Sequence, residues 1–332
     1  MTARPLVAVT DVLPRAWLEP LVQACDVVAC DEDAPGVLSP PILEAAPRVE
    51  GLLCTLEDRI DASTLDRFPR LRVVSTLSVG FDHIDLAACA ARGIVVGHTP
   101  GVLTDATADL AMTLMLACAR RLPEATASVR EGRWGRWRPT GLLGLELAGK
   151  VLGLVGFGQI GRAVARRARA FGMEILFVRR TPTDDPLGRR VDLDTLTANA
   201  DVVSLHVPLS DETRGWVDGA FLARMKPGAL LVNTARGAVV DTDALVDALR
   251  AGHLGGAGLD VTDPEPLPAD HPLLDMPNVV VTPHIGSATT DTRRRMARLA
   301  IDNLLAGLSG RPLPHAVALP AASTLAHNGG PG

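Results

Sequence analysis

Lys150 to Arg180 has the sequence KVLGLVGFGQIGRAVARRARAFGMEILFVRR, and the architecture of the chain can be worked out from this segment. It begins with an apolar run, Val151–Val155, of the kind that forms a buried parallel strand. Three glycines follow with the spacing G-x-G-x-x-G, then apolar residues at helical spacing, then a second apolar run, Met173–Val178. The pattern predicts a β-α-β unit whose glycines lie where the first strand turns into the helix.

The position of these glycines predicts a dinucleotide-binding loop. Gly156 permits the tight turn, Gly158 lets a pyrophosphate approach the backbone, and Gly161 lets the helix pack closely on the strand. The helix N-terminus adds N–H donors and the positive end of the helix dipole. An ordinary α/β turn without a ligand is the alternative, because glycines also occur in plain turns. The cofactor contacts expected from this loop are Gly156, Phe157, Gly158, Gln159, Ile160 and Gly161.

The end of the second strand indicates which dinucleotide is preferred. Folds that bind NAD usually have an acid there that accepts from the ribose 2′-OH, whereas this chain has Val178-Arg179-Arg180-Thr181-Pro182. A guanidinium binds a 2′-phosphate with paired hydrogen bonds, and a carboxylate would repel it. We therefore predict that NADP(H) is preferred and NAD(H) is possible, with Arg180 as the main phosphate ligand and Arg179 and Thr181 beside it. A solvated basic loop is the alternative.

Composition places the chain among ordinary globular proteins. Its 332 residues suffice for two domains, 47% are hydrophobic and 21% are charged. A net charge of −5 gives no sign of nucleic-acid binding. The five cysteines lack metal-ligand spacing, so we expect buried free thiols, no metal site and a reducing compartment, the cytoplasm. No signal-peptide core and no apolar run of membrane-spanning length are present, so no membrane partner is expected.

Short apolar runs alternate with helical patterns on both sides of the glycine loop. This alternation predicts an α/β fold with doubly wound parallel sheets. The predicted strands are Leu6–Val9, Asp26–Ala29, Gly51–Cys54, Arg72–Ser75, Ile94–Val96, Val151–Val155, Met173–Val178, Val202–Leu205, Ala229–Val232, Gly256–Leu259 and Val279–Val281. The named helices are Pro14–Ala24, Pro41–Ala46, Thr104–Arg121 and one from near Thr289 to Leu308. Residues 320–332 have the composition of a disordered tail.

The helix over Thr104–Arg121 is apolar on more than one face, which predicts burial between domains or at a subunit interface. The segment Glu131–Pro139 that follows contains two of the four tryptophans and is predicted to be irregular. We predict a homodimer built on this helix and on the segment after it.

Three polar residues follow predicted strands in the second half of the chain. Arg236 lies in VNTARGAVV, Glu265 in DPEP and His284 in PHIGS. Reduction of a 2-keto acid requires a cation that binds the carboxylate, a proton donor that titrates near neutrality, and a carboxylate that favours the charged donor. Each residue alone has an ordinary structural explanation, but the three together at strand ends after a dinucleotide loop predict catalysis.

The chain resembles the D-isomer-specific 2-hydroxyacid dehydrogenases over nearly its whole length, to about Pro314. Within that family it is most similar to the members that reduce glyoxylate to glycolate and hydroxypyruvate to D-glycerate. The matching segments are GLLC, LSVGFDHIDL, GHTPGVLTDATADLA, ARRLPEA, WGRWRPTGLLG, GFGQIG, ARGAVV, AGLDVTDPEPLPADHPLL, PHIGSAT and NLLAGLSGRPLP.

The resemblance implies a Rossmann-type NAD(P)-binding domain, residues 102–289, inserted in a flavodoxin-like substrate domain, residues 1–101 plus 290–332. It also implies that Arg236 binds the substrate carboxylate, that His284 is the general acid, and that Glu265 pairs with it. Further implied substrate contacts are the backbone N–H groups of Val79 and Gly80, then Ser287, and Trp137 from the partner subunit of the dimer. Further implied cofactor contacts are Val207, Pro208, Thr234, Ala235, Asp260, which would orient the nicotinamide amide, and Gly286.

Two positions depart from the family pattern. Gly101 stands where an acid is common, and Arg179 stands where a smaller residue is usual. Alternative functions are another dehydrogenase of the family, such as phosphoglycerate or formate dehydrogenase, and a non-enzymatic dinucleotide-sensing corepressor. A regulatory C-terminal extension is not expected, because the chain ends soon after the last predicted helix. The pair Glu265 and His284 disfavours the formate enzyme, which transfers no proton by acid–base chemistry.

Overall fold

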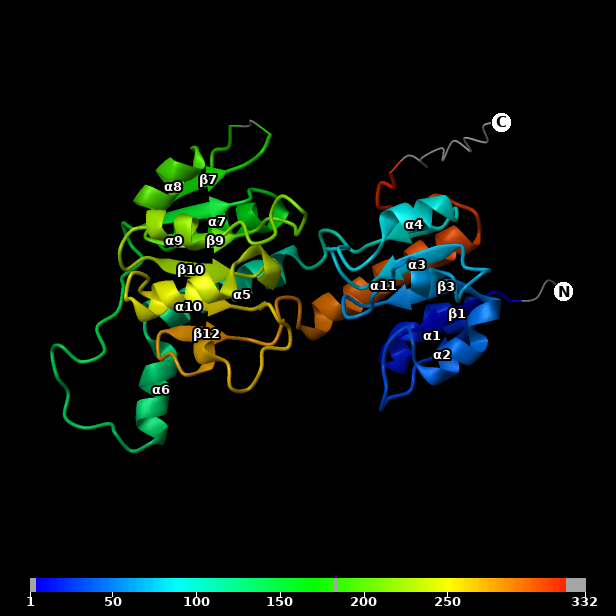
Figure 1. Cartoon of the computed structure of the whole chain (residues 1–332), viewed down its shortest axis with the longest axis horizontal. Helices are drawn as coiled ribbons and strands as arrows, with labels where there is room; N and C mark the ends of the chain where they lie inside the picture. The colour runs from blue at the N-terminus through cyan, green and yellow to red at the C-terminus, as the bar shows by residue number, and fades with distance from the viewer. Residues whose placement is uncertain (1–3, 182–183, 321–332) are drawn as a thin grey trace, which may run out of the picture. The chain divides into compact units, whose positions relative to one another are not determined.

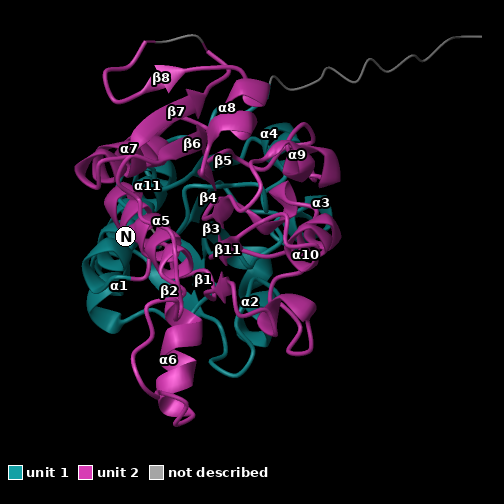
Figure 2. Ribbon diagram, turned by 90° about the vertical axis from the view of Figure 1, so that its left-hand side faces the viewer, with its two compact units in different colours: residues 1–103, 289–332 teal, residues 104–288 magenta. Residues whose placement is uncertain are grey.

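The computed structural model of the chain describes residues 4–181 and 184–320. The chain divides into two compact units, one made of Met1–Leu103 with Thr289–Gly332 and the other of Thr104–Ala288 (Figures 1 and 2). The second unit is therefore an insertion in the first. Pro182 and most of the predicted tail, residues 321–332, lie outside the described residues.

The first unit contains a five-stranded sheet in its described part, with the order β2-β1-β3-β4-β5 and parallel pairing throughout. This is the strand order of flavodoxin-like folds. α11 packs against β3, β4, β5 and α1, and its buried Ile301 and Leu304 join Val73 in one apolar cluster. The elements are β1 (Leu6–Val9), α1 (Arg15–Ala24), β2 (Asp26–Ala29), α2 (Pro40–Ala45), a 3₁₀ turn (Ala46–Arg48), β3 (Val49–Cys54), α3 (Ala62–Leu65), β4 (Val73–Thr76), α4 (Leu86–Ala91), β5 (Val95–Gly97) and α11 (Thr290–Leu308).

In its described part, the second unit contains a seven-stranded parallel sheet in the order β12-β11-β10-β9-β6-β7-β8. This order is that of a dinucleotide-binding fold, and its topological switch point lies between β6 and β9. The elements are α5 (Thr104–Ala119), α6 (Leu122–Arg130), β6 (Val151–Val155), α7 (Gln159–Ala170), β7 (Glu174–Val178), β8 (Arg189–Arg190), α8 (Leu193–Asn199), β9 (Val202–Leu205), α9 (Gly219–Arg224), β10 (Leu230–Asn233), a 3₁₀ turn (Gly237–Val239), α10 (Thr242–Arg250), β11 (Gly256–Leu259), a 3₁₀ turn (Pro272–Leu274) and β12 (Val279–Val281).

The predicted α/β class with two parallel sheets is confirmed. β1, β2, β6, β9, β11 and β12 have the predicted bounds, and the other predicted strands differ by one or two residues at one or both ends. α6 and the two-residue β8 were not predicted from the sequence. Leu122-Pro123 was a signal for α6, because proline is favoured in the first turn of a helix.

α5 carries apolar residues on more than one face, and its contacts within the second unit help to explain this. It packs against α7 and against β10, β11 and β12. Side chains such as Ala111, Leu114 and Met115 are buried in the cluster that also contains Phe157 and Val164. These contacts inside one unit account for much of the apolar composition of α5, whereas Asp109 and Thr113 are exposed.

The cysteines are buried free thiols, as predicted. Burial raises the pKa of the Cys89 thiol to about 11 and that of the Cys118 thiol to about 12. Both thiols are therefore protonated at neutral pH and behave as small apolar side chains. Among the helices of the described residues, none combines the length and apolarity needed to cross a membrane.

Candidate active site

The glycine loop lies between β6 and α7 and can approach a ligand through its backbone. Gly156 has φ +94°, and a Cβ there would overlap the carbonyl oxygen of His206. Gly158 is the N-cap of α7 with open space around its Cα, and no side chain caps the helix. The first N–H groups of α7 are thus not covered by a capping side chain, which suits a pyrophosphate.

Other residues of this loop differ in what they can offer. Phe157 is buried and stacks on Phe177, with ring centroids 3.8 Å apart, so only its backbone can face a cofactor. Ile160 packs against the core, whereas Gln159 is exposed and accepts from Thr104 Oγ1 at 3.3 Å.

The basic loop after β7 keeps two arginines available. Within residues 4–181 and 184–320, neither Arg179 nor Arg180 forms an ion pair, and Arg180 is exposed, as is the adjacent Thr181. Arg162 in the first turn of α7 pairs with the buried carboxylate of Asp185. The charge of Arg162 is therefore largely neutralised by Asp185 and is less available to a phosphate.

The strand order brings the three predicted catalytic residues to one edge of the sheet. β10, β11 and β12 are adjacent and parallel, so the loops that leave them emerge at the same edge. Arg236 follows β10, Glu265 lies in the loop after β11, and His284 follows β12. The Arg236 Nη1 group donates to the carbonyl of Ala235 at 2.8 Å.

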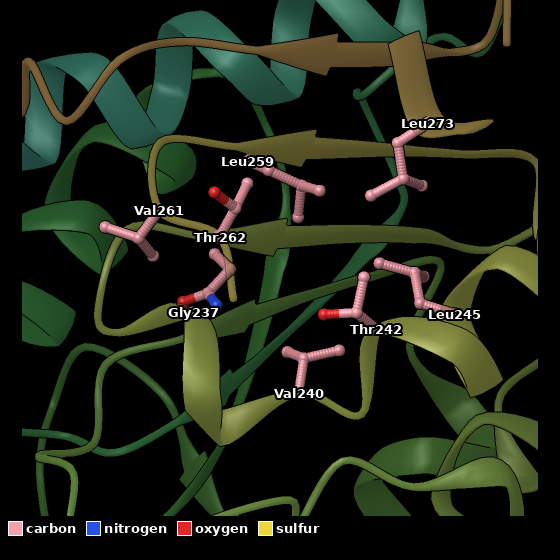
Figure 3. Close-up of a pocket in the computed structure, with 9 residues that line it drawn as sticks. Gly237, Val240, Thr242, Leu245, Leu259, Val261, Thr262 and Leu273 are labelled. Carbon is pink, nitrogen blue, oxygen red and sulfur yellow. The ribbon is translucent and has the colours of Figure 1, made fainter. Parts of the chain in front are cut away.

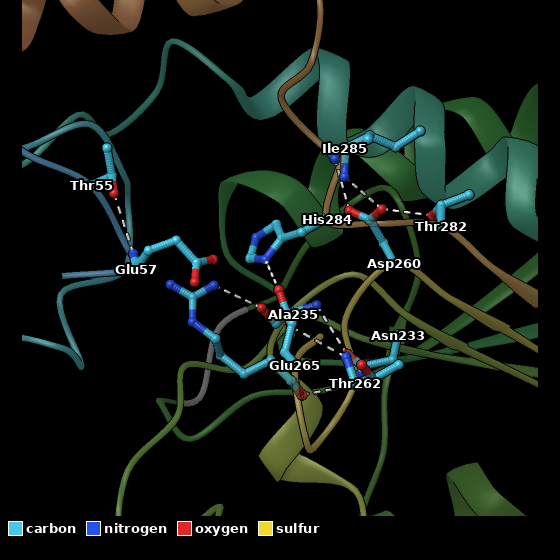
Figure 4. Close-up of polar contacts among 12 residues, drawn as sticks. Thr55, Glu57, Asn233, Ala235, Asp260, Thr262, Glu265, Thr282, His284 and Ile285 are labelled. Atoms are coloured by element: carbon cyan, nitrogen blue, oxygen red, sulfur yellow. Dashed lines mark hydrogen bonds and ion pairs between the residues drawn. The ribbon is translucent and has the colours of Figure 1, made fainter. Parts of the chain in front are cut away.

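His284 and Glu265 form the central contact of this edge, 2.6 Å between Nδ1 and Oε1 (Figure 4). Burial alone would raise the pKa of the Glu265 carboxyl, but the hydrogen bond and charge of His284, with smaller contributions from the Thr262 N–H and Arg236, lower it overall. Glu265 is therefore a carboxylate at neutral pH. Because its contact occupies Nδ1, the Nε2 atom of His284 is left for a substrate.

Asp260 binds the loop that carries His284. Its carboxylate accepts from Thr282 Oγ1 at 2.6 Å, Ile285 N at 2.8 Å and Gly286 N at 2.7 Å. Its own carbonyl accepts the N–H of His284 at 2.9 Å, and His284 has φ +51°. Burial raises the pKa of Asp260, although the hydrogen bonds oppose this. Three of about four acceptor positions on the carboxylate are thus taken by protein.

Asn233 is a buried residue that the sequence analysis missed. Its Oδ1 accepts the N–H of Ala235 at 3.0 Å, and its Nδ2 donates to the carbonyl of Arg236 at 2.8 Å. The amide therefore fixes the turn that presents the arginine. A polar residue ending an apolar strand, immediately before Thr-Ala-Arg, was the available signal.

The loops that carry Arg236 and Glu265 touch each other through Gly237. A Cβ at Gly237 would overlap the carbonyl of Thr262, whose N–H donates to Glu265 Oε2 at 3.3 Å. A small cavity lies beside this contact, with mostly apolar walls and no charged side chain among them (Figure 3). Its lining does not suit a carboxylate substrate. The lining residues are Asn233, Gly237, Val240, Thr242, Leu245, Leu259, Val261, Thr262 and Leu273.

The remaining predicted site residues of the second unit differ in their burial and hydrogen bonding. Gly286 is buried, and both its backbone groups are bonded, the carbonyl to Thr107 Oγ1 at 3.3 Å. The buried Oγ1 of Thr234 has no hydrogen-bond partner within the described residues, as expected of a group that faces a bound cofactor. Val207 and Ser287 are partly buried, and Pro208 is exposed. Trp137 is 80% exposed.

Val79 and Gly80 belong to the other unit, in the loop that follows β4. Both are partly exposed. In the described part of the chain, no group of three or more His, Cys, Asp or Glu side chains is placed to hold a metal ion.

Known proteins of one family are similar to this chain over most of its length. The family model "D-isomer specific 2-hydroxyacid dehydrogenase, NAD binding domain" matches residues 112–286. The chain is 48% identical over 318 residues to a glyoxylate reductase of Thermofilum pendens, covering 94% of each protein. It is 44% identical over 316 residues to the glyoxylate reductase/hydroxypyruvate reductase of Mus musculus, covering 93% of this chain and 96% of that one. An NADPH-dependent glyoxylate/hydroxypyruvate reductase of Sinorhizobium meliloti, solved with NADP and malonate, superposes with a TM-score of 0.85 at 36% identity, over 95% of this chain and 97% of that one.

Proposed function

The chain belongs to the D-isomer-specific 2-hydroxyacid dehydrogenases, and we propose that it reduces glyoxylate to glycolate and hydroxypyruvate to D-glycerate, with NADPH preferred over NADH. The observation that carries the proposal is the 2.6 Å contact between His284 and Glu265 at the sheet edge that also presents Arg236. The relatives that act on glyoxylate and hydroxypyruvate support the choice of substrates.

His284 is the proposed proton donor. When bound, the reduced nicotinamide supplies the hydride that adds to the carbonyl carbon of the keto acid. The negative charge that develops on the carbonyl oxygen is neutralised by the proton on Nε2 of His284, which becomes neutral. Glu265 is ionised and orients the ring by accepting a hydrogen bond from Nδ1.

Arg236 is the proposed ligand of the substrate carboxylate and polarises the ketone as a fixed cation. A guanidinium suits both tasks, since it stays charged and can form two parallel hydrogen bonds to a carboxylate. The N–H groups of Val79 and Gly80 are the proposed second set of carboxylate donors. Ser287 is a further proposed contact.

The residues of the second unit fit a dinucleotide. The uncapped N-terminus of α7 would bind the pyrophosphate, and the hydroxyl of Thr234 lacks a protein partner. Arg180, with Arg179, would bind the 2′-phosphate of NADPH, because both are free of ion pairs in residues 4–181 and 184–320. Arg162 is a weaker candidate, since Asp185 already neutralises it.

A homodimer built on Thr104–Arg121 and the segment after it is part of the proposal. In that segment no side chain of α6 is buried, and Trp134, Trp137 and Leu143 are 79%, 80% and 64% exposed. This gathering of exposed apolar side chains in one segment supports an interaction site there. Trp137 would then reach the substrate of the partner subunit. Sedimentation should give a mass near twice 34.9 kDa, and a fully active monomer would contradict this part.

The reaction is tested by following NADPH and NADH consumption with glyoxylate, hydroxypyruvate and pyruvate. We expect both proposed substrates to be reduced, faster with NADPH. Failure of all three keto acids with both cofactors would refute the reductase function.

The cofactor preference is tested separately with Arg180→Ala. Loss of one charge-assisted hydrogen bond, worth about 1.5–3 kcal/mol, should raise the KM for NADPH by about 10- to 150-fold and leave that for NADH unchanged. Arg166→Ala, on the exposed side of α7, is the matched control and should change neither KM. Equal losses with both cofactors in Arg180→Ala would contradict the phosphate assignment.

A further inference from the structure

The loop after β4 has three successive carbonyl groups bonded within its own unit. The Ser78 carbonyl accepts the N–H of Thr99 at 2.9 Å, and the Val79 carbonyl accepts from His98 Nδ1 at 2.9 Å. The Gly80 carbonyl accepts from Ser78 Oγ at 2.5 Å. Each of the three peptide planes is therefore fixed in orientation.

The fixed planes determine where the N–H groups of this loop point. In a planar trans peptide, the C=O of one residue and the N–H of the next point in opposite directions. Because the Val79 carbonyl is directed at His98, the Gly80 N–H points away from His98. Because the Ser78 carbonyl is directed at Thr99, the Val79 N–H points away from Thr99. In the described part of this unit, neither N–H donates to a protein acceptor.

His98 is held in place by contacts of both its ring and its backbone. A carbonyl only accepts, so Nδ1 of His98 carries the proton in this contact. The ring of Phe81 packs edge-on against the His98 ring, with centroids 5.4 Å apart. The carbonyl of His98 accepts from Asn303 Nδ2 at 3.0 Å, and its N–H donates to the His315 carbonyl at 3.1 Å.

Asn303 anchors this arrangement from α11. Its side chain is fully buried, and its Oδ1 accepts the N–H of His315 at 2.9 Å. A Cβ on Gly97 would lie 2.8 Å from the Asn303 side chain, so the chain leaving β5 is packed directly on it. The position of His98 is thus set by the core of the unit and does not depend on a ligand.

We propose that His98 is a positioning residue, which orients the Val79–Gly80 peptide so that the Gly80 N–H is presented to the substrate carboxylate. This rests on the proposed function, in which Val79 and Gly80 bind that carboxylate through their N–H groups. Ser78 fixes the following peptide through the Gly80 carbonyl, and its hydroxyl is itself 2.8 Å from Thr76 Oγ1. A peptide whose dipole is fixed before binding needs no ordering when the anion arrives, which favours affinity.

The test compares two replacements of His98. His98→Asn retains a donor, because the amide nitrogen of asparagine can occupy the place of Nδ1, whereas His98→Leu removes it. Full loss of one charge-assisted donor would raise the KM for the keto acid by about 10- to 150-fold, and a misdirected donor loses part of this. We expect a rise of about 5- to 20-fold in His98→Leu, with kcat within about threefold of wild type, the pattern of lost ground-state binding. His98→Asn should stay close to wild type.

Two controls separate positioning from stability. His315→Leu removes a second histidine of the same network, but His315 participates through its backbone, so no change in KM is expected. The KM for NADPH, whose proposed site lies in the other unit, should be unchanged in every variant. If His98→Leu fails to fold, His98→Gln serves instead, since its amide lies one bond further from the backbone and misses the Nδ1 position.

The outcomes distinguish this inference from the function on which it rests. A wild-type protein that reduces no 2-keto acid refutes the reductase function and the inference with it. An active wild type whose His98→Leu variant keeps its KM, or whose His98→Asn variant loses as much as His98→Leu, refutes the role of His98 and leaves the function intact.

Discussion

Replacement of Asp260 by asparagine tests how the loop that carries His284 is held. One carboxylate oxygen accepts from Thr282 Oγ1 and Ile285 N, and the other accepts from Gly286 N. An asparagine amide has one oxygen to accept. Its favourable orientation keeps the contacts to Thr282 and Ile285 and turns Nδ2 toward the Gly286 N–H, so that a donor faces a donor.

The magnitude follows from these contacts. Asp260 is 2% exposed, so water cannot replace the lost acceptor. The bond to Gly286 is worth about 1.5–3 kcal/mol, and the other two weaken because the acceptor is no longer charged. Removal of a buried charge, whose cost is visible in the raised pKa of Asp260, offsets part of the loss. We expect a net loss of about 2 kcal/mol, or about 30-fold in kcat if the loop shifts and His284 is displaced.

The assay is a set of steady-state constants for keto acid and NADPH, together with urea unfolding. Asp260→Asn should lower kcat, the free energy of unfolding, or both. The two effects, each expressed as a free energy, should together amount to about 2 kcal/mol. Asp218→Asn is the matched control. Asp218 accepts one N–H, that of Phe221 at 2.8 Å, as the N-cap of α9, and asparagine caps helices about as well as aspartate.

A different pattern would refute this reasoning. If Asp260→Asn raised only the KM for NADPH, with kcat and unfolding unchanged, the carboxylate would act directly on the cofactor. The role inferred from the family resemblance, orientation of the nicotinamide amide, would then be the better description.

Three other predictions follow from the site. In Glu265→Gln, kcat should fall, because a neutral amide accepts a weaker hydrogen bond from His284 Nδ1 than a carboxylate does and holds the ring less firmly; an unchanged kcat would reduce Glu265 to a structural role. Burial lowers the pKa of His206 from 6.5 to about 4, so the unfolded chain takes up the proton first and stability should fall by about 3 kcal/mol as pH drops from 6.5 to 4. In His206→Gln, the urea midpoint should change less with pH over this range than it does in the wild type. Equal changes in the two proteins would contradict this. Gly237→Ala should lower the melting temperature, since overpacking costs about 1–3 kcal/mol, and should lower kcat because the loop with Glu265 must move away from the new methyl group; an unchanged kcat would show that the two loops are not coupled.

Local sequence was sufficient for the class of fold and for the glycine loop. The run Val151–Val155 is apolar throughout because a central parallel strand is covered on both faces, and periodicity records this burial directly. Gly156 was predictable for the same kind of reason, since its φ of +94° is needed by the turn itself. Such features depend on neighbours a few residues away, so the sequence alone contains them.

The residue types at successive strand ends identified Arg236, Glu265 and His284 as candidates, and the family resemblance implied their roles. Neither could say which atoms meet. The contact between His284 Nδ1 and Glu265 Oε1 spans 19 residues and arises because β11 and β12 are adjacent. Likewise, the sequence could not tell that Arg162 is paired with Asp185 or that the Phe157 ring faces the core. These pairings depend on which side chains the folded chain brings close together.

The roles of Asp260 and His98 were decided by tertiary structure alone. Each uses a polar side chain to fix the backbone of a loop, and a buried polar group must find a partner wherever the fold supplies one. His98 and its partner are 19 residues apart, and Asp260 reaches residues 22 to 26 positions away, so no short pattern encodes these contacts. Periodicity specifies which face of a helix or strand is buried, because buried residues recur at regular intervals along that element. The pairing of individual donors and acceptors is settled only when the folded chain brings its strand ends together.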